Sequence, residues 1–285
     1  MIRKIIQKSR SKLRQNIQKT FPSKDVVVPP ILSSEQKKDS DTKTWKDYTW
    51  LYPSLQHELE YHPQIQNWRN NGSQRTHIDF VHQIHKDIYQ FPILSDSCIQ
   101  KWCAELENIH RWRQLHHIEV TAPNSMNHYG FVLKDVDAQQ PFLKMMQDVI
   151  SPLSQILFPK LNIKNLETLH AFVVEYGSGL DRDLGFHIDA SDITLNLCFG
   201  EQFLGGELYF EGRRCERHRQ NPTQPEERFV YAHVPKYAIL HAGKHRHGAL
   251  SIERGTRRNL ILWCHSQTLI DDSNCLEWCG EFERK

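Results

Sequence analysis

Long apolar runs are missing from this sequence of 285 residues. A helix that crosses a membrane needs roughly 18 or more consecutive apolar residues, whereas the longest apolar stretches here, such as residues 259–263, have the length of a strand. The basic start of the chain is not followed by the apolar block of a secretory signal. These absences predict an intracellular, cytoplasmic protein without a transmembrane segment.

The spacing of a disulfide framework is lacking as well. The seven cysteines are an odd number, which indicates reduced thiols in an intracellular protein. A strong net charge is also absent, because the formal charge is only +2, so the chain as a whole carries no signal for nucleic acid. With 39% hydrophobic residues and only 13 glycines, the chain can bury a core and is typical of a globular protein.

Acidic residues are absent from residues 1–19, which carry seven Lys or Arg and place several Ile and Leu loosely on one helical face. Four interpretations stay open: a solvated basic tail, a mitochondrial or other transit peptide, a contact with an anionic membrane surface, and a nucleic-acid arm. The stretch that follows mixes paired prolines with Ser, Lys and Asp. We therefore expect residues 1–44 to form a flexible segment and linker.

Two kinds of periodicity divide the rest of the chain. Residues 45–158 are predicted to be a mainly helical support region, with one helix that begins at Ser95 or Asp96 and a second, over residues 140–158, that bends at Pro152. Residues 159–285 instead alternate with a period of two, as strands do. The expected strands are residues 169–176, 192–199, 206–212, 228–234, 237–243 and 257–265. This order predicts an α+β fold, in which helices support an antiparallel barrel or jelly roll.

The strongest chemical signal is a histidine and an aspartate two residues apart, His187 and Asp189. Alone, such a pair is more often an ordinary strand edge. A third candidate, His247, follows sixty residues later, and residues two apart in a strand share a face, so the three can converge in a barrel. Two imidazoles and one carboxylate leave three open positions on a metal, which suits non-haem Fe(II) oxygenases.

Arg257 stands ten residues beyond His247, at the start of a predicted strand. Its planar fork can bind a carboxylate through two hydrogen bonds, which the point charge of a lysine does less well. Its neighbour Arg258 should point to the opposite face of the strand. The combined set predicts a metal site with a clamp for an anionic co-substrate.

These residues resemble a known family, the 2-oxoglutarate and Fe(II)-dependent dioxygenases of the prolyl 4-hydroxylase and lysyl hydroxylase branch. Residues 170–212 are similar to that branch in their strand, Tyr, H-x-D, alternating strand and Gly-Gly hairpin, and residues 247–263 in the closing His, Gly-x-Arg and strand. The nearest resemblance is to the 2-oxoglutarate and iron-dependent oxygenase domain-containing protein 2 group, through residues 124–133 and the Gly-Ala-Leu after His247. It spans roughly residues 78–279.

The resemblance implies a double-stranded β-helix core over residues 159–285. It further implies that His187, Asp189 and His247 bind Fe(II), that 2-oxoglutarate and O2 are co-substrates, and that ascorbate serves as a reductant. Arg257 would bind the distal carboxylate of 2-oxoglutarate. Tyr176 matches a position whose hydroxyl reaches the co-substrate, although a core tyrosine is the alternative.

Further pocket residues follow from strand alternation and from the family pattern. Thr194 and Asn196 share one face of a predicted strand, and polar residues that point into a barrel need partners, so one of them should help to hold 2-oxoglutarate. His241 and His245 lie close in sequence to His247, but the family pattern leaves both as neighbours of the site or surface residues. The sequence also marks three residues as the pocket mouth or a capped turn: Asn124, Asn127 and Tyr129.

The implied reaction is hydroxylation of a C–H bond with succinate and CO2 as co-products. The resemblance favours a side chain of a protein or peptide as substrate and leaves a small molecule open. It does not favour nucleic acid, because the repair oxygenases carry a further Arg on the last strand that residues 259–265 lack. Two rivals stay open, a non-catalytic binding module on the same fold and a metalloenzyme that does not use 2-oxoglutarate.

The C-terminal tail carries two cysteines four residues apart, Cys275 and Cys279. A structural zinc ion would need two further ligands, and Cys264 and His265 are the candidates nearest in sequence. A reduced, packed pair of thiols is the alternative.

Overall fold

The computed structural model describes residues 52–72, 78–200, 203–267 and 279 of the chain. The predictions for the basic segment and linker at 1–44, and for Cys275, lie outside these residues. None of the helices described is both long and apolar enough to cross a bilayer.

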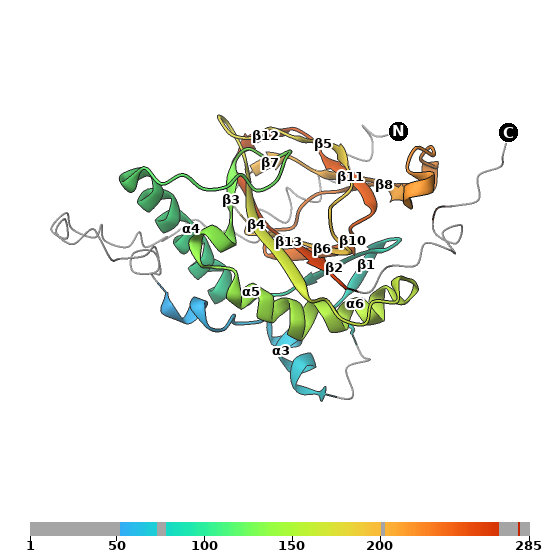
Figure 1. Cartoon of the computed structure of the whole chain (residues 1–285), viewed down its shortest axis with the longest axis horizontal. Helices are drawn as coiled ribbons and strands as arrows, with labels where there is room; N and C mark the ends of the chain where they lie inside the picture. Colours follow the sequence, from blue (N-terminus) through green and yellow to red (C-terminus); the bar gives the residue numbers. More distant parts are fainter. Residues whose placement is uncertain (1–51, 73–77, 201–202, 268–278, 280–285) are drawn as a thin grey trace.

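Two antiparallel sheets form the centre of the described structure (Figure 1). The larger sheet orders seven described strands as β1 (His82–His85), β2 (Ile88–Pro92), β10 (Tyr237–Ala242), β6 (Ile193–Cys198), β13 (Arg257–His265), β4 (Thr168–Tyr176) and β3 (Gly130–Val132). The smaller sheet orders β5 (Leu184–His187), β11 (His245–Ala249), β8 (Leu208–Arg213) and β9 (Arg228–Tyr231). A separate pair joins β7 (Phe203–Gly205) to β12 (Ile252–Gly255).

The chain passes back and forth between the two sheets. After β1, β2, β3 and β4 in the larger sheet, it crosses to the smaller at β5, returns at β6, forms β8 and β9 in the smaller, and then alternates through β10, β11 and β13. All the pairings between the named strands of the described residues are antiparallel. This connectivity is that of a double-stranded β-helix, or jelly roll, so the predicted α+β fold class is confirmed.

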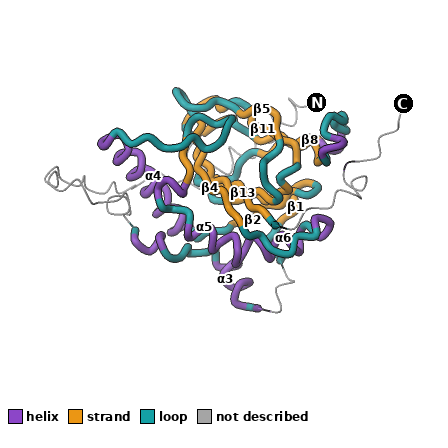
Figure 2. Tube along the Cα trace, viewed as in Figure 1, coloured by secondary structure: helices purple, strands orange, loops and turns teal. Residues whose placement is uncertain are grey.

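Helices cover the outer face of the larger sheet (Figure 2). They are α3 (Pro63–Asn70), α4 (Asp96–His116), α5 (Gln140–Met145) and α6 (Ser151–Leu157). The large apolar core lies between them and the sheet, where Trp102 and Phe142 of the helices share one cluster with Leu195, Leu240 and Leu260 of the strands. Burial of these side chains fixes which face of each strand turns away from the helices.

The predicted helices begin and bend close to the expected residues. Ser95 caps α4, because its side-chain oxygen accepts a hydrogen bond from the Cys98 N–H at 3.0 Å. Between α5 and α6 the chain forms a π-helical turn at Met146–Ile150, directly before Pro152. A proline removes one helical hydrogen bond, so the interruption lies where the sequence predicts a bend.

The predicted mainly helical region over residues 45–158 also contains strands. Within it, β1 and β2 form a hairpin that pairs with β10 at the edge of the larger sheet. The sequence of β1, His-Gln-Ile-His, is mostly exposed and offers no apolar alternation, so its strand character comes from pairing with β2. The support region thus contributes strands to the sheet as well as helices.

Candidate active site

Three predicted ligands meet at one end of the smaller sheet. His187 is the last residue of β5 and pairs directly with His247 of the antiparallel strand β11, and their ring centroids are 4.3 Å apart. Asp189 follows two residues after His187 and is buried. One potential ligand atom from each of the three lies within 4.8 Å of the others, so the structure brings together the residues that the sequence predicts.

Backbone carbonyls hold the two imidazoles in one orientation. The Nδ1 of His187 lies 2.8 Å from the carbonyl oxygen of Gly185, and the Nδ1 of His247 lies 2.8 Å from that of His245. If each Nδ1–H donates to its carbonyl, each Nε2 keeps the lone pair that binds a metal. The two Nε2 atoms face Asp189 Oδ1 at 3.4 and 3.7 Å.

The second carboxylate oxygen of Asp189 is held from the larger sheet. Thr194 of β6 donates its hydroxyl hydrogen to Asp189 Oδ2 at 2.7 Å, and the Thr194 hydroxyl lies 2.7 Å from that of Ser191. The backbone N–H of Asp189 donates to the carbonyl of Gly243 at 3.0 Å. These bonds orient the carboxylate so that Oδ1 faces the imidazoles. A direct contact of Thr194 with 2-oxoglutarate stays a prediction.

Burial and the contacts among the three side chains shift their pKa values. Burial lowers the pKa of His247 to about 3, so this imidazole is neutral near neutral pH. Burial alone would raise the pKa of Asp189 and lower that of His187, but the contacts between Asp189 and the facing histidines outweigh it, so the pKa of Asp189 lies below its usual range and the pKa of His187 lies above it. Two neutral imidazoles and one carboxylate are the donor set that suits Fe(II) with open positions, so the residues fit this metal.

The other histidines of this segment are buried but outside the ligand set. His241 of β10 lies with its Nε2 3.9 Å from Asp189 Oδ2, and its Nδ1 lies 2.9 Å from the carbonyl oxygen of Ala242. His245 packs its ring against Phe210, with 5.1 Å between centroids. Burial lowers the pKa of both histidines. They support the site as neutral neighbours, and neither is a surface residue.

Arg257 occupies the start of β13 and is 2% exposed. Its guanidinium carbon lies 4.2 Å from the centroid of the Tyr176 ring, directly across the β13–β4 pair, and it donates a hydrogen bond to the carbonyl of Gly206. Within the described residues no carboxylate is in ion-pair contact with it, although its charge interacts with that of the buried Glu207, and its Nε has no hydrogen-bond partner. A buried cation without an anion is costly, so this position calls for an anionic ligand.

The Arg257 side chain and the metal ligands open into one pocket. Its lining includes Asp189 and His247 together with Tyr176, Asn196 and Arg257. It also includes Asn259, two residues beyond Arg257 on the same face of β13, whose amide donates to Asn196 Oδ1 at 2.5 Å. Asn259 Oδ1 has no partner among the described residues. The pocket therefore joins a metal-binding set to a cationic end with spare hydrogen-bonding capacity.

The loop at residues 124–129 closes one side of this pocket. Asn127 is buried and donates to the Tyr176 hydroxyl oxygen at 2.9 Å, while Asn124 donates to Asn127 Oδ1 at 3.1 Å. Burial raises the pKa of Tyr176, which keeps its hydroxyl protonated. Asn124 and Asn127 line the pocket, but Tyr129 is 43% exposed and lines a different hollow beside α4. Of the two interpretations left open, Tyr129 therefore does not fit the pocket mouth, and Asn124 caps a turn by accepting from the backbone N–H groups of Met126 and Asn127.

Known proteins are similar in sequence to this chain over about two thirds of its length. The family model of an OGFOD2-like domain matches residues 45–162. The chain is 42% identical over 197 residues to the 2-oxoglutarate and iron-dependent oxygenase domain-containing protein ICU11 of Arabidopsis thaliana, across 68% of this chain and 50% of that protein. It is 32% identical over 197 residues to human 2-oxoglutarate and iron-dependent oxygenase domain-containing protein 2, across 69% and 53% respectively.

The chain is thus similar, over about two thirds of its own length, to 2-oxoglutarate and iron-dependent oxygenases. It spans about half the length of the curated relatives it matches. A more distant relative is human procollagen-lysine,2-oxoglutarate 5-dioxygenase 2, which is 26% identical over 185 residues, or 63% of this chain and 24% of that protein. The family resemblance stated from the motifs is thus confirmed.

Several residues of this oxygenase site escaped the sequence prediction. Asn259 in the pocket lining lies beside His233, 3.4 Å apart between Asn259 Nδ2 and His233 Nδ1, and Ser191 supports Thr194. Asn259 could have been found from its spacing, because it shares a strand face with Arg257. His233 follows β9 in a segment without a motif, so only the folded chain reveals it.

Proposed function

We propose that this chain is an Fe(II)- and 2-oxoglutarate-dependent dioxygenase that hydroxylates a C–H bond on a protein side chain, with succinate and CO2 as co-products. One observation carries the proposal: two of the three metal ligands, the buried Asp189 and His247, line the same pocket as the buried Arg257, which has no carboxylate in ion-pair contact among the described residues. A metal site alone would suit many enzymes. A guanidinium at the inner end of that pocket is what a dicarboxylate co-substrate requires.

His187, Asp189 and His247 would hold the ion, and Arg257 would bind the distal carboxylate of 2-oxoglutarate. When bound, the iron, the oxo acid and O2 together supply the oxidising power that breaks the C–H bond. The chain's own contribution is binding and orientation. Carbonyl contacts fix both imidazoles, and Thr194 fixes the carboxylate, so the ligands are ordered before the ion arrives.

The inner pocket is suited to keep water away from the bound co-substrate. Apolar side chains such as Phe172, Val174 and Ile261 line it together with the polar groups. On the loop side, Asn127 bonds both Tyr176 and, at 3.4 Å, Asp181, which fastens the loop over the pocket. Low polarity strengthens the pairing of Arg257 with a carboxylate. Tyr176, Asn196 and Asn259 offer further hydrogen-bonding groups at this end.

The choice of a protein side chain as substrate rests on the relatives. The procollagen-lysine dioxygenase is named for lysine of procollagen, and the prolyl and lysyl hydroxylase branch matches the motifs of this chain. A small-molecule substrate or a non-catalytic role of the same fold would be alternative outcomes of the following test.

The deciding experiment is an anaerobic titration of the Fe(II)-loaded protein with 2-oxoglutarate. We expect a visible charge-transfer band from the chelate, and slow formation of succinate after O2 is admitted even without a substrate. Asp189→Ala should lose both signals while circular dichroism shows a folded barrel, and Asp189→Glu should regain little, because sites need placement within about 0.5 Å. Iron-loaded protein without band or succinate would indicate a binding module. Full activity of His187→Ala would refute the ligand assignment.

The hydroxylated substrate requires a separate assay. Succinate formation above the uncoupled rate, measured with peptide libraries and with small hydroxylatable acids, would identify the substrate class. A gain of one oxygen on a peptide side chain by mass spectrometry would support the proposal, and stimulation only by small molecules would refute its substrate part.

A further inference from the structure

A second group of possible metal ligands lies at the end of β8, outside the active site. Cys215 and His218 belong to the loop that follows this strand, and Cys279 comes from the C-terminal tail, 64 residues further along. Their ligand atoms all lie within 4.8 Å of one another, and both cysteines are buried. This is one of two such groups among the described residues, and the other is the active site.

The distances within the group are close to those of a shared ion. The Sγ of Cys215 lies 3.2 Å from His218 Nδ1. Zinc bonds of about 2.0–2.3 Å in a tetrahedron place two ligand atoms roughly 3.4–3.8 Å apart. The backbone N–H of Cys215 donates to Cys279 Sγ at 3.1 Å, a short approach that suits a thiolate acceptor. Small adjustments would therefore seat an ion between the three side chains.

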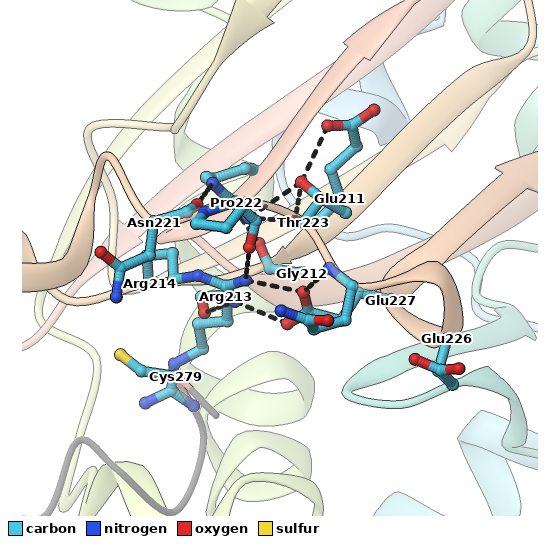
Figure 3. Close-up of polar contacts among 12 residues, drawn as sticks. Glu211, Gly212, Arg213, Arg214, Asn221, Pro222, Thr223, Glu226, Glu227 and Cys279 are labelled. Carbon is cyan, nitrogen blue, oxygen red and sulfur yellow. Dashed lines mark hydrogen bonds and ion pairs between the residues drawn. The ribbon is translucent and has the colours of Figure 1, made fainter. Parts of the chain in front are cut away.

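The loop that carries Cys215 and His218 is ordered by other contacts. The Arg214 guanidinium forms two hydrogen bonds with the carboxylate of Glu227, at 2.5 and 2.6 Å, and Arg246 donates to the carbonyls of Glu211 and Asn221 at 2.6 and 2.8 Å. Figure 3 shows the pair of Arg214 and Glu227, and Cys279 on the same side of the loop. The two ligands are thus presented on a fixed turn, in which the His218 N–H donates to the carbonyl of Cys215.

The chemistry of the donors favours a metal over a packed or oxidised pair. Two thiolates and an imidazole are soft and borderline ligands that select zinc, and a C-x2-H turn with a distant third ligand matches the spacing of structural zinc sites. A disulfide between the cysteines would leave no role for the imidazole that faces Cys215.

We propose that Cys215, His218 and Cys279 bind a structural zinc ion that fastens the C-terminal tail to the loop after β8. Binding of Zn²⁺ displaces the two thiol protons, so the ion and two thiolates carry no net charge. The fourth tetrahedral position is left for water or a further group. This site requires neither iron nor 2-oxoglutarate. A failed test of zinc binding would therefore leave the proposed activity untouched, and a failed test of the activity would leave the zinc site untouched.

The structure corrects the candidate partners of Cys279 that the sequence suggested. Cys264 does not join Cys279, because it lies on the helix side of β13 within the main core, where burial raises its pKa. His265 ends the same strand and is not part of the group. The partners of Cys279 are instead Cys215 and His218.

The test uses the full chain carrying Asp189→Ala, so that metal at the iron site does not interfere. After expression with zinc, plasma mass spectrometry should find about one zinc per chain, and Cys215→Ser or Cys279→Ser in the same background should reduce it to about a tenth or less. Cys103→Ser is the matched control, because this half-buried thiol on α4 lies outside the group. It should keep its zinc.

A second measurement uses the Asp189→Ala chain alone, so it remains informative even if the cysteine variants do not fold. Cobalt-substituted Asp189→Ala should show the intense near-ultraviolet sulfur-to-cobalt charge-transfer band of thiolate ligation, and zinc should protect Cys215 and Cys279, but not Cys103, from alkylation. Absence of zinc and of the cobalt band would overturn the proposal. Zinc retained equally by both serine variants, or a Cys215–Cys279 disulfide in freshly purified protein, would also overturn it.

Discussion

Two neighbouring residue pairs on the same two strands differ in their surroundings and in their expected roles. Arg257 faces Tyr176 across β13 and β4, and the next pair along joins Arg258 to Glu175. Arg257 turns into the barrel, over an aromatic ring and next to the metal ligands. Arg258 turns to the helix side, where its Nε donates to Glu175 at 2.6 Å and its guanidinium also pairs with Glu107 of α4.

The difference shows how strand alternation separates function from stability. The outward arginine already has carboxylate partners from its own fold, and His110 of α4 shares Glu175 with it at 2.8 Å. The inward arginine has none in ion-pair contact among the described residues and is left to an anion from outside. The two arginines differ in the face of the strand to which they point and not in residue type. The following experiments test whether the inward arginine serves binding and the outward arginine serves stability.

The largest effect is expected at Arg257. If it makes a buried bidentate pair with the distal carboxylate, Arg257→Ala should cost about 2–5 kcal/mol, or on the order of 30-fold to several thousand-fold in apparent 2-oxoglutarate affinity. Arg257→Lys should recover part of this, since an ammonium lacks the planar fork. The measurement is the 2-oxoglutarate dependence of succinate formation at two salt concentrations.

Arg258→Ala is the matched control in that assay and should leave the affinity nearly unchanged. Equal losses at both positions, both strongly sensitive to salt, would mean that the segment acts only through its charge. In that case the contrast between the two faces would be wrong.

The next effect concerns stability and belongs to Arg258. Its removal leaves the buried carboxylate of Glu175 with His110 as its remaining partner, which should lower the free energy of unfolding by about 1–3 kcal/mol. Urea denaturation of wild type and Arg258→Ala measures it. Arg111→Ala, an exposed arginine on α4, should change stability by less than about 0.5 kcal/mol. Equal losses in both variants would contradict the special role of the pair.

A smaller effect of the same pair should appear as a pH dependence. Burial raises the pKa of Glu175, but the hydrogen bond with His110 and the charge of Arg258 outweigh it, so the folded pKa lies below the ordinary value. The stabilisation is therefore present above the unfolded pKa of about 4.3 and is lost as pH falls through the folded pKa. Glu175→Gln should flatten the loss of unfolding free energy in this acidic range. An unchanged acid profile would show that Glu175 is not responsible.

The sequence predicts the strands that carry a strong apolar pattern. β4, β6, β10 and β13 are strands of six to nine residues that are mostly buried, and all four were expected. β5 and β11 were missed as strands, because Leu-Gly-Phe-His and His-Arg-His-Gly-Ala show no alternation of apolar residues. Their conformation comes from pairing with each other and with β8, which no local pattern reports.

The candidate site divides in a similar way. His187, Asp189, His247 and Arg257 were found because their spacing has a chemical meaning and resembles a family. The contacts that hold them, from Thr194 to Asp189 and from the two imidazoles to carbonyls, depend on how strands meet in space. Cys279 could not be paired from sequence, since its partners lie 61 and 64 residues away in a loop without a regular pattern.

The smallest effect is expected from Tyr176, the residue that faces Arg257 across the two strands. Tyr176→Phe keeps the ring under the Arg257 guanidinium but removes the hydroxyl that accepts from Asn127 and faces the pocket. One neutral hydrogen bond contributes about 0.5–1.5 kcal/mol, so 2-oxoglutarate affinity should fall by roughly 2- to 13-fold. Tyr176→Leu should lose more, because the cation–π contact disappears as well. Titrations of the iron-loaded variants measure both losses. If Tyr176→Phe and Tyr176→Leu bind 2-oxoglutarate as tightly as wild type, Tyr176 is a core tyrosine, and Arg257 alone defines the inward face.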